Sequence, residues 1–340
     1  MSPLKQLVWA RLKQFFREPG AVFWTFGFPL LVAVVLGLAF RHGGTPKVPV
    51  VVLAGQLQSE RIGLLAQDGR FMVTGCEIEE VDELFRRGKT VLAVGGDIPI
   101  SYLFDPQHDD ASRARQLVDE VLQSAAGRVN PLATADEKVT ASGARYIDFL
   151  IPGLLGFNIM SSSLWGMAWP IVQTRRRKLL KRLAATPMYR SHYLLSFILA
   201  RLAFVLAEVV TLVLFAWLVF DVQVQGSFLI LCVFSVLGAM SFAGFGLLAA
   251  SRTESAETTS GVVNLIVFPM MLLSGVFFSY AHYPDWMQPF IGALPLTLFN
   301  DGLRGIFNGV SPVELLWPLL VLGLYGLVTF LSALRLFKWM

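Results

Sequence analysis

The feature that most constrains this chain is a set of six long apolar runs. Each is close to or above the length of about 20 residues that an α-helix needs to cross a hydrocarbon core of about 30 Å. Backbone N–H and C=O groups cannot be left unbonded in lipid, so such runs must form helices. The sequence therefore predicts an α-helical polytopic membrane protein with six transmembrane helices. The runs cover residues 22–40, 149–172, 192–220, 227–250, 261–280 and 315–334.

The charge content supports the same class. Only 15% of the 340 residues are charged and 55% are hydrophobic, with a mean hydropathy of +0.60, whereas soluble domains carry about 25% charged residues. The net charge of +4 could suggest a nucleic-acid partner. However, the basic residues cluster at the ends of the apolar runs, as membrane topology requires. We therefore expect contact with membrane lipid and no binding of nucleic acid.

Residues 4–17 precede the first run and are expected to form an amphipathic helix on the membrane surface. Apolar side chains recur at helical spacing from Leu4 to Phe16. Arg11 falls inside this apolar stripe, so we expect its side chain to snorkel toward water. Residues 1–40 thus comprise a surface helix and the first transmembrane helix.

Residues 41–145 have a different composition. They hold 12 Lys and Arg against 15 Asp and Glu, a net charge of −3, and can bury a small core of their own. We predict an inserted α+β domain, followed by five further transmembrane helices in residues 146–340. Its predicted strands are 48–53, 71–74, 91–94 and 102–104, and its predicted helices are 77–87 and 111–126.

Basic residues near the runs also predict the orientation. With six spans, the three basic segments lie on one side, which we expect to be the cytoplasmic face of the plasma (inner) membrane. Both termini are then cytoplasmic, whereas residues 41–145 and the outer segment 282–310 are extracytoplasmic. Three prolines interrupt 282–310, so we expect short re-entrant or interfacial helices there. The three basic segments hold Lys5, Arg11, Lys13 and Arg17; seven Lys and Arg between 175 and 190; and Arg335 and Lys338.

The densest positive charge lies in the loop after the second span, residues 174–190. One interpretation is a topology anchor, which requires charge alone. The other is a helix that docks into a groove on a partner protein. Leucines at helical spacing followed by Thr-Pro favour docking, because an anchor needs no apolar face. The residues assigned to this contact are Arg177, Lys178, Leu179, Leu180, Lys181, Arg182, Leu183, Thr186 and Pro187.

The sequence gives little indication of catalysis. Gly88-Lys89-Thr90 resembles the end of a phosphate-binding loop, but Glu83 stands where that motif requires its first glycine. The four histidines are scattered, and no metal-ligand spacing is present. We therefore expect no catalytic residue, metal site or cofactor in this chain.

Three segments together resemble one transporter family. The chain is similar to permease subunits of ABC-2 type ATP-binding cassette transporters, although Lys178-Leu179 replaces the family's Gly-Thr and Ser279 stands where proline is common. The resemblance implies a coupling helix between spans two and three, and a homodimer or a heterodimer with a sister permease. It also implies two separate nucleotide-binding subunits, which bind ATP and Mg²⁺. The segments are IDFLIPGLLG at 147–156, RKLLKRLAATPMYR at 177–190, and LLSGVFF at 272–278 with LPL at 294–296 and DGLR at 301–304.

Polar side chains inside the spans are costly and often functional. Glu208 lies deep in the third span, and Arg201, seven residues earlier, is expected to be too far away for direct pairing. Either Glu208 contacts substrate or a gate, or it forms a buried pair with another helix. An ion pair between Asp148 and the outer residues Asp301 and Arg304 is a further expectation. The candidates for a substrate path or gate are Asn158, Ser161, Ser162, Glu208, Asn264, Ser274, Asp301 and Arg304.

Two hypotheses of function follow. In the first, the chain is the membrane subunit of an ABC exporter that moves an amphipathic, lipid-like or drug-like molecule outward. In the second, it is a non-transporting sensor or anchor, whose outer domain binds a ligand and whose basic loop recruits a signalling partner. Co-purification with a partner that carries a phosphate-binding loop would favour the first.

Overall fold

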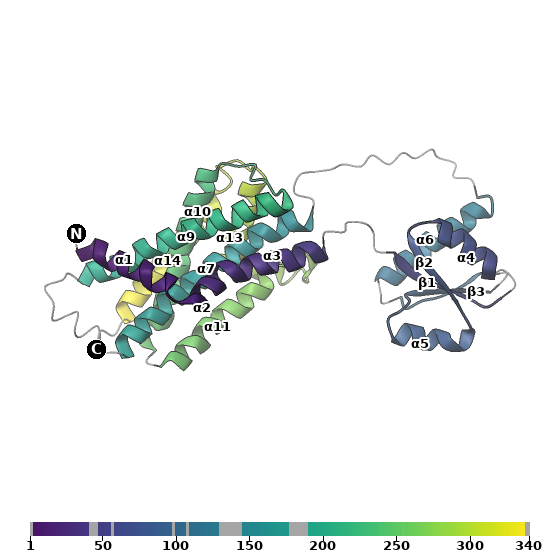
Figure 1. Cartoon of the computed structure of the whole chain (residues 1–340), viewed down its shortest axis with the longest axis horizontal. Coiled ribbons are helices and arrows are strands. Elements are labelled where there is room, and N and C mark those ends of the chain that lie inside the picture. The colour runs from purple at the N-terminus through teal and green to yellow at the C-terminus, as the bar shows by residue number, and fades with distance from the viewer. Residues whose placement is uncertain are drawn as a thin grey trace. The chain divides into compact units, whose positions relative to one another are not determined.

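The computed structural model describes residues 3–40, 47–55, 58–96, 99–106, 109–128, 145–176, 190–253 and 255–336. The chain divides into two compact units, which are described separately (Figure 1). The transmembrane unit comprises residues 1–41 and 140–340, and the second unit comprises residues 42–139. All nine contact residues assigned to the basic loop lie at 177–189, outside the described residues.

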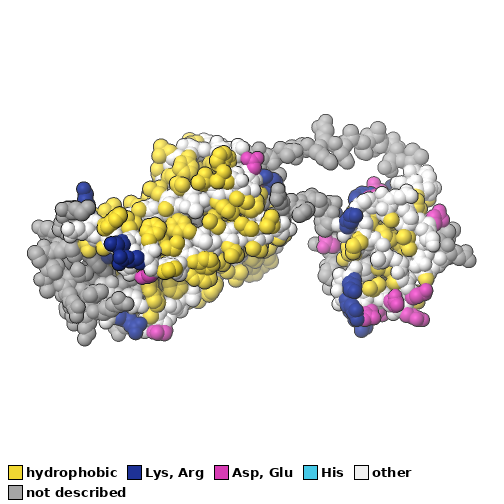
Figure 2. All heavy atoms as spheres, in the orientation of Figure 1, with side chains coloured by type: hydrophobic (Ala, Val, Ile, Leu, Met, Phe, Trp, Pro, Cys, Tyr) yellow, Lys and Arg dark blue, Asp and Glu magenta, His cyan; other side chains and the backbone are white. Residues whose placement is uncertain are grey.

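Within the described residues, six helices are long and apolar enough to cross a membrane, which confirms the predicted fold class. Hydrophobic side chains cover much of the transmembrane unit in Figure 2, as a lipid-facing surface requires. The spans are Pro19–Ala39, Tyr146–Arg176 (α7), Leu195–Phe220 within α9 (Arg190–Phe220), Phe228–Arg252 (α10), Ala256–Leu273 (α11) and Leu316–Leu336 (α14).

Helix α7 is the centre of the transmembrane unit. In its most apolar stretch 72% of the residues are buried, against 17–44% in the other spans. It contacts α3 (Phe28–Ala39), α9, α10, α11 and α13 (Pro295–Phe307). Glycines permit this packing: a Cβ at Gly246 of α10 would lie 2.6 Å from the Leu164 carbonyl oxygen of α7. Helices α7 and α10 therefore pack with their backbones in close contact.

The first span combines three helical segments, namely α2 (Pro19–Val22), the π-helical turn η1 (Phe23–Gly27) and α3 (Phe28–Ala39). Pro19 occupies the first turn of α2, where a missing N–H costs nothing. Pro29 follows the π turn. Such turns are rare and are frequent at functional sites.

Helix α1 (Pro3–Phe16) packs along α9, as Figure 1 shows. Its Arg11 does not snorkel as expected: Nε donates to the Ser196 hydroxyl at 2.8 Å, and the guanidinium lies 3.1 Å from the centre of the Phe197 ring. Phe15 packs against Phe204 of α9 with ring centroids 4.3 Å apart. Helix α9 therefore supplies a polar and an aromatic partner for Arg11, whose side chain was expected to reach water.

The fifth span ends earlier than predicted. Helix α11 ends at Leu273 rather than near Tyr280, and Gly275 adopts a φ of +66°. Only glycine reaches this conformation without strain. The chain then forms η3 (Tyr280–His282), α12 (Gln288–Gly292) and α13 (Pro295–Phe307). Ser274 therefore lies in a turn after the helix and not within the span.

Helix α13 is more deeply packed than the interfacial helix expected for 282–310. Nine of its residues are buried, and it contacts α7, α10 and α14. A Cβ at Gly302 would lie 2.2 Å from the Phe234 ring of α10, and one at Gly156 of α7 would lie 1.9 Å from Asn300 Oδ1. Glycines on α7 and on α13 itself therefore allow α13 to pack closely against α7 and α10.

The second unit is a four-stranded sheet with helices on both faces. Its order is β2-β1-β3-β4; β1, β2 and β3 are parallel, and β4 pairs antiparallel to β3. Helices α4 and α6 cover the face with Val50 and Val52, and α5 covers the face with Val51 and Leu53. The elements are β1 (Val48–Leu53), α4 (Gln58–Gln67), β2 (Phe71–Cys76), η2 (Ile78–Glu80), α5 (Val81–Arg86), β3 (Leu92–Gly95), β4 (Ser101–Leu103) and α6 (Asp109–Ala125).

Candidate functional site

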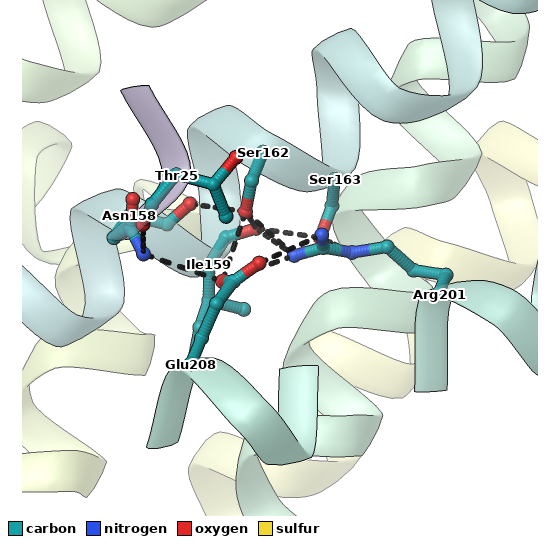
Figure 3. Close-up of polar contacts among 7 residues, drawn as sticks. All are labelled: Thr25, Asn158, Ile159, Ser162, Ser163, Arg201 and Glu208. Atoms are coloured by element: carbon teal, nitrogen blue, oxygen red, sulfur yellow. Dashed lines mark hydrogen bonds and ion pairs between the residues drawn. The ribbon is translucent and has the colours of Figure 1, made fainter. Parts of the chain in front are cut away.

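Five of the polar side chains within the described spans converge between the first span, α7 and α9 (Figure 3). They lie near the middle of their helices rather than at the ends. We name this set the buried polar network. It consists of Asn158, Ser162 and Ser163 of α7, Arg201 and Glu208 of α9, and the carbonyl oxygens of Thr25 and Ile159.

Arg201 and Glu208 form a direct ion pair, contrary to the expectation that they lie too far apart. Nη1 is 2.9 Å from Oε1, and Nη2 is 3.3 Å from Oε2. Seven residues span about 10.5 Å along a helix, which appeared too long for one side chain. Two turns place both residues on the same face, however, and the extended arginine and the glutamate bridge the distance together.

Neutral donors and acceptors surround this pair. Arg201 donates to the Ser162 and Ser163 hydroxyls at 2.6 and 3.0 Å, and to the Ile159 carbonyl oxygen at 3.3 Å. Ser162 and Asn158 in turn donate to Glu208 Oε2 at 3.0 and 3.4 Å. Glu208 is 1% exposed. A charge at this depth persists only when it is paired and hydrogen-bonded, and both conditions are met.

Asn158 connects the network to the first span. Its Nδ2 donates to the Thr25 carbonyl oxygen at 3.0 Å. Pro29 has no N–H, so it removes the donor that an α-helix would supply to Thr25 four residues earlier. The asparagine amide supplies a donor at this position. The network thereby joins three transmembrane helices through one set of hydrogen bonds.

A second polar group lies around α13. Asp301 and Arg304 pair at 3.4 Å, and the Tyr280 hydroxyl donates to Asp301 at 3.1 Å. Arg304 also donates to the Gly275 carbonyl oxygen and lies 3.7 Å from the centre of the Phe149 ring of α7. These contacts fix α13 to the turn after α11 and to the start of α7.

Asp148 does not form the expected ion pair with Asp301 and Arg304. It pairs with Arg145, three residues earlier, at 2.8 Å. Arg145 also donates to the carbonyl oxygens of Phe220 and Asp221 at the end of α9, at 3.1 and 3.2 Å. Asp148 is therefore paired with a residue three positions earlier in the chain and not with a residue of α13.

The remaining candidates are divided between the two groups or lie apart from them. The Asn300 amide donates to the Ser274 carbonyl oxygen at 3.0 Å, which places Ser274 beside α13. Ser161 and Asn264 are half-buried and, among the described contacts, bond to neither group. Sequence reasoning missed Arg201, Thr25 and Arg145 as site residues. Pro29, which removes an N–H from a predicted span, was a signal that could have indicated Thr25.

These features define a polytopic helical membrane protein in which buried polar contacts connect the spans. Comparison with known families then gives a specific assignment. The sequence profile of the ABC-2 type transporter family matches residues 115–308, which include α7, α9, α10, α11 and α13. The chain belongs to this family, and it is an ABC transport permease.

Known relatives support the assignment. The chain is 27% identical over 181 residues to ABC transporter G family member 20 of Dictyostelium discoideum, covering 52% of this chain and 24% of that protein. It is 25% identical over 200 residues to the inner membrane transport permease YadH of Escherichia coli, covering 58% and 75%. It is 27% identical over 88 residues to the daunorubicin resistance permease DrrB1 of Streptomyces coeruleorubidus, covering 26% and 30%. The chain thus matches about a quarter of the first relative and three quarters of the second.

Proposed function

We propose that this chain is the membrane-spanning subunit of an ABC exporter. It moves an amphipathic, lipid-like or drug-like substrate outward, using ATP hydrolysed by a separate nucleotide-binding subunit. The observation that carries the proposal is the family match, because it extends over four of the six spans and the outer helix α13. Membership in a transporter family favours this hypothesis over a sensor or anchor.

The proposed assembly contains two permease chains, identical or sister subunits, and two nucleotide-binding subunits. Residues 174–190 act as its coupling loop on the cytoplasmic side, where the basic residues concentrate. Residues 41–145 and the 282–310 segment then lie on the extracytoplasmic side of the membrane. The inner end of α7 supports this orientation, because Arg175 and Arg176 occupy its last turn.

The substrate class is inferred from the printed names of two relatives. One is a daunorubicin resistance permease, and the other, 27% identical over 107 residues, is a probable multidrug permease of Escherichia coli, YbhR. Daunorubicin is therefore a suitable first probe. Outward transport is proposed on the same basis, since a transporter confers resistance to a compound by removing it from the cell.

The buried polar network is proposed to set the resting arrangement of the first three spans. All of its charged groups are paired within the protein, which favours a connection between helices over a direct contact with substrate. Reorientation of the spans must then exchange or stretch the bond between Asn158 and Thr25. ATP binding can drive this only if the motor contacts the two arrangements differently.

A co-expression experiment tests the proposal. The full chain is produced with a candidate ATP-binding subunit, and inverted membrane vesicles are assayed for ATP-dependent uptake of daunorubicin and for ATPase activity. Leu183→Asp is expected to abolish stimulation of the ATPase and transport while leaving the permease in the membrane, because a charge disrupts an apolar docking face. Val313→Asp is the matched control, since Val313 is 71% exposed in the turn before α14.

Two results would contradict this function. The first is a permease that binds no subunit with a phosphate-binding loop. The second is a Leu183→Asp variant whose ATPase stimulation equals that of the Val313→Asp control, which would remove the coupling role from this loop.

A further inference from the structure

Arg175, in the last turn of α7, makes an unusual set of contacts with a neighbouring helix. Its Nη1 donates to the carbonyl oxygens of Ala250 and Thr253 at 3.1 and 2.7 Å, and its Nη2 donates to that of Ser251 at 3.4 Å. All three acceptors lie at the end of α10. One guanidinium thus contacts three backbone carbonyls of another span.

These carbonyls need an external donor. The last four C=O groups of any α-helix have no partner within the helix, and a cation there also interacts favourably with the helix dipole. Thr253, which follows α10, has an extended conformation with ψ of +133°, so the chain does not fold back to satisfy them. Arg175 therefore caps α10 from a different helix.

The capped end continues directly into α11. The Thr259 hydroxyl donates to Thr253 Oγ1 at 2.8 Å, and the Thr253 hydroxyl donates to the Ala249 carbonyl oxygen at 3.2 Å. Ser255 caps α11 by accepting from the Thr258 N–H at 3.0 Å. These bonds join the ends of α10 and α11 into one hairpin, and Arg175 connects α7 to that hairpin.

The position of Arg175 along the chain gives these contacts a functional meaning. Helix α7 ends at Arg176, so Arg175 lies at the helical start of the proposed coupling loop, residues 174–190. Any displacement of that loop by the motor reaches α7 at this turn. Helices α7 and α10 are also in backbone contact at Leu164 and Gly246, so the two helices are connected at two levels along their length.

We propose that Arg175 is a positioning residue for coupling, which transmits movement of the coupling loop to the α10–α11 hairpin. The inference rests on the proposed function, in that it assumes a motor acting at residues 174–190. Arginine is suited to the role because its planar fork holds several acceptors at fixed angles, whereas lysine presents a single point charge. Arg252, exposed at the end of α10 itself, provides a matched control.

The test uses the full chain in complex with its ATP-binding subunit in lipid nanodiscs. Amide hydrogen exchange of residues 250–260 is measured without nucleotide and after trapping with ADP and vanadate. In the wild type, trapping is expected to change exchange in the hairpin. In Arg175→Met, exchange without nucleotide is expected to rise about tenfold, because charge-assisted bonds that hold the hairpin are lost. The KM for ATP stays unchanged, and the response to trapping disappears.

Controls separate coupling from simple stability. Arg252→Met is expected to behave as the wild type, and Arg175→Lys, which can bond fewer carbonyls at once, is expected to give a smaller response than the wild type. If Arg175→Met does not accumulate, Arg175→Lys provides the measurement.

Specific outcomes overturn the inference. If Arg175→Met exchanges faster in both states but keeps the full nucleotide-dependent difference, Arg175 is a structural cap only. If the wild-type hairpin does not respond to trapping, the inference fails while partner binding and ATPase activity leave the proposed function intact. If no ATP-binding subunit co-purifies with the wild type, the proposed function itself fails.

Discussion

Replacing Glu208 and Arg201, singly and together, tests whether the buried polar network holds the first three spans. Removing one member of a buried ion pair typically costs about 3–5 kcal/mol, because the other charge is left without its counterion. The two residues differ in what remains. After Glu208→Leu, the Arg201 guanidinium keeps Ser162, Ser163 and the Ile159 carbonyl oxygen as acceptors. We therefore expect a cost near the lower limit, about 3 kcal/mol.

Arg201→Met should be more severe. The Glu208 carboxylate, which is 1% exposed, would keep only Ser162 and Asn158 as donors. The expected cost is near the upper limit, about 5 kcal/mol. The double variant removes both charges and should be less destabilised than either single variant, by under about 3 kcal/mol, so the sum of the two single costs should exceed the cost of the double variant by more than about 5 kcal/mol.

Reversible unfolding in mixed detergent micelles, followed by tryptophan fluorescence, measures these free energies. Asn264→Leu, at a half-buried position of α11 away from the network, is the control and should cost no more than about 1 kcal/mol. If the two single variants each cost under about 1 kcal/mol, or if their effects simply add in the double variant, the pair does not hold these helices together.

Two further predictions concern α13 and the second unit. Gly156→Ala should destabilise the protein by about 1–3 kcal/mol, because the new Cβ would lie 1.9 Å from Asn300 Oδ1. Gly166→Ala on the same helix is the control and should not destabilise the protein, because a Cβ there would have no atom within 4 Å. Equal unfolding free energies of the two variants would contradict the packing of α13. Burial, together with the hydrogen bond to Asp119, raises the pKa of Tyr102 to about 12. The neutral phenol therefore stabilises the fold fully below the unfolded pKa of about 10, and this contribution is lost as the pH rises toward 12. Absorbance at 295 nm, as the difference between wild type and Tyr102→Phe, should show a midpoint near 12, and a midpoint near 10 would refute the assignment.

Some features followed from the sequence alone. Six apolar runs specified six transmembrane helices, because the backbone in lipid has few other ways to satisfy its polar groups. The strands of the second unit also lie within two residues of their predicted ranges, since alternating and β-branched runs report local geometry directly. Helix α4 was missed because Gln58–Gln67 holds few apolar residues, and only Arg61 and Leu65 are buried.

The site was only partly predictable. The sequence singled out Asn158, Ser162 and Glu208 as costly polar residues, but it assigned Arg201 to no partner. The connection to Thr25 uses a backbone carbonyl, so the sequence pointed to it only indirectly, through the N–H that Pro29 lacks. The contacts of Arg175 were equally hidden, since their acceptors are three carbonyls about 75 residues later in the chain.

The division between what the sequence determined and what the tertiary structure decided has a physical cause. Transfer of apolar segments into lipid is a property of each segment alone, so the sequence determined which helices exist and where they cross the membrane. Neighbouring helices in lipid gain little from burying apolar surface and associate through close packing and polar bonds. Which helices meet depends on small residues such as Gly156 and Gly246 and on the reach of individual side chains. Only the tertiary structure therefore decided that Glu208 lies beside Arg201, that α13 fills the space among α7, α10 and α14, and that α10 ends on an arginine of α7.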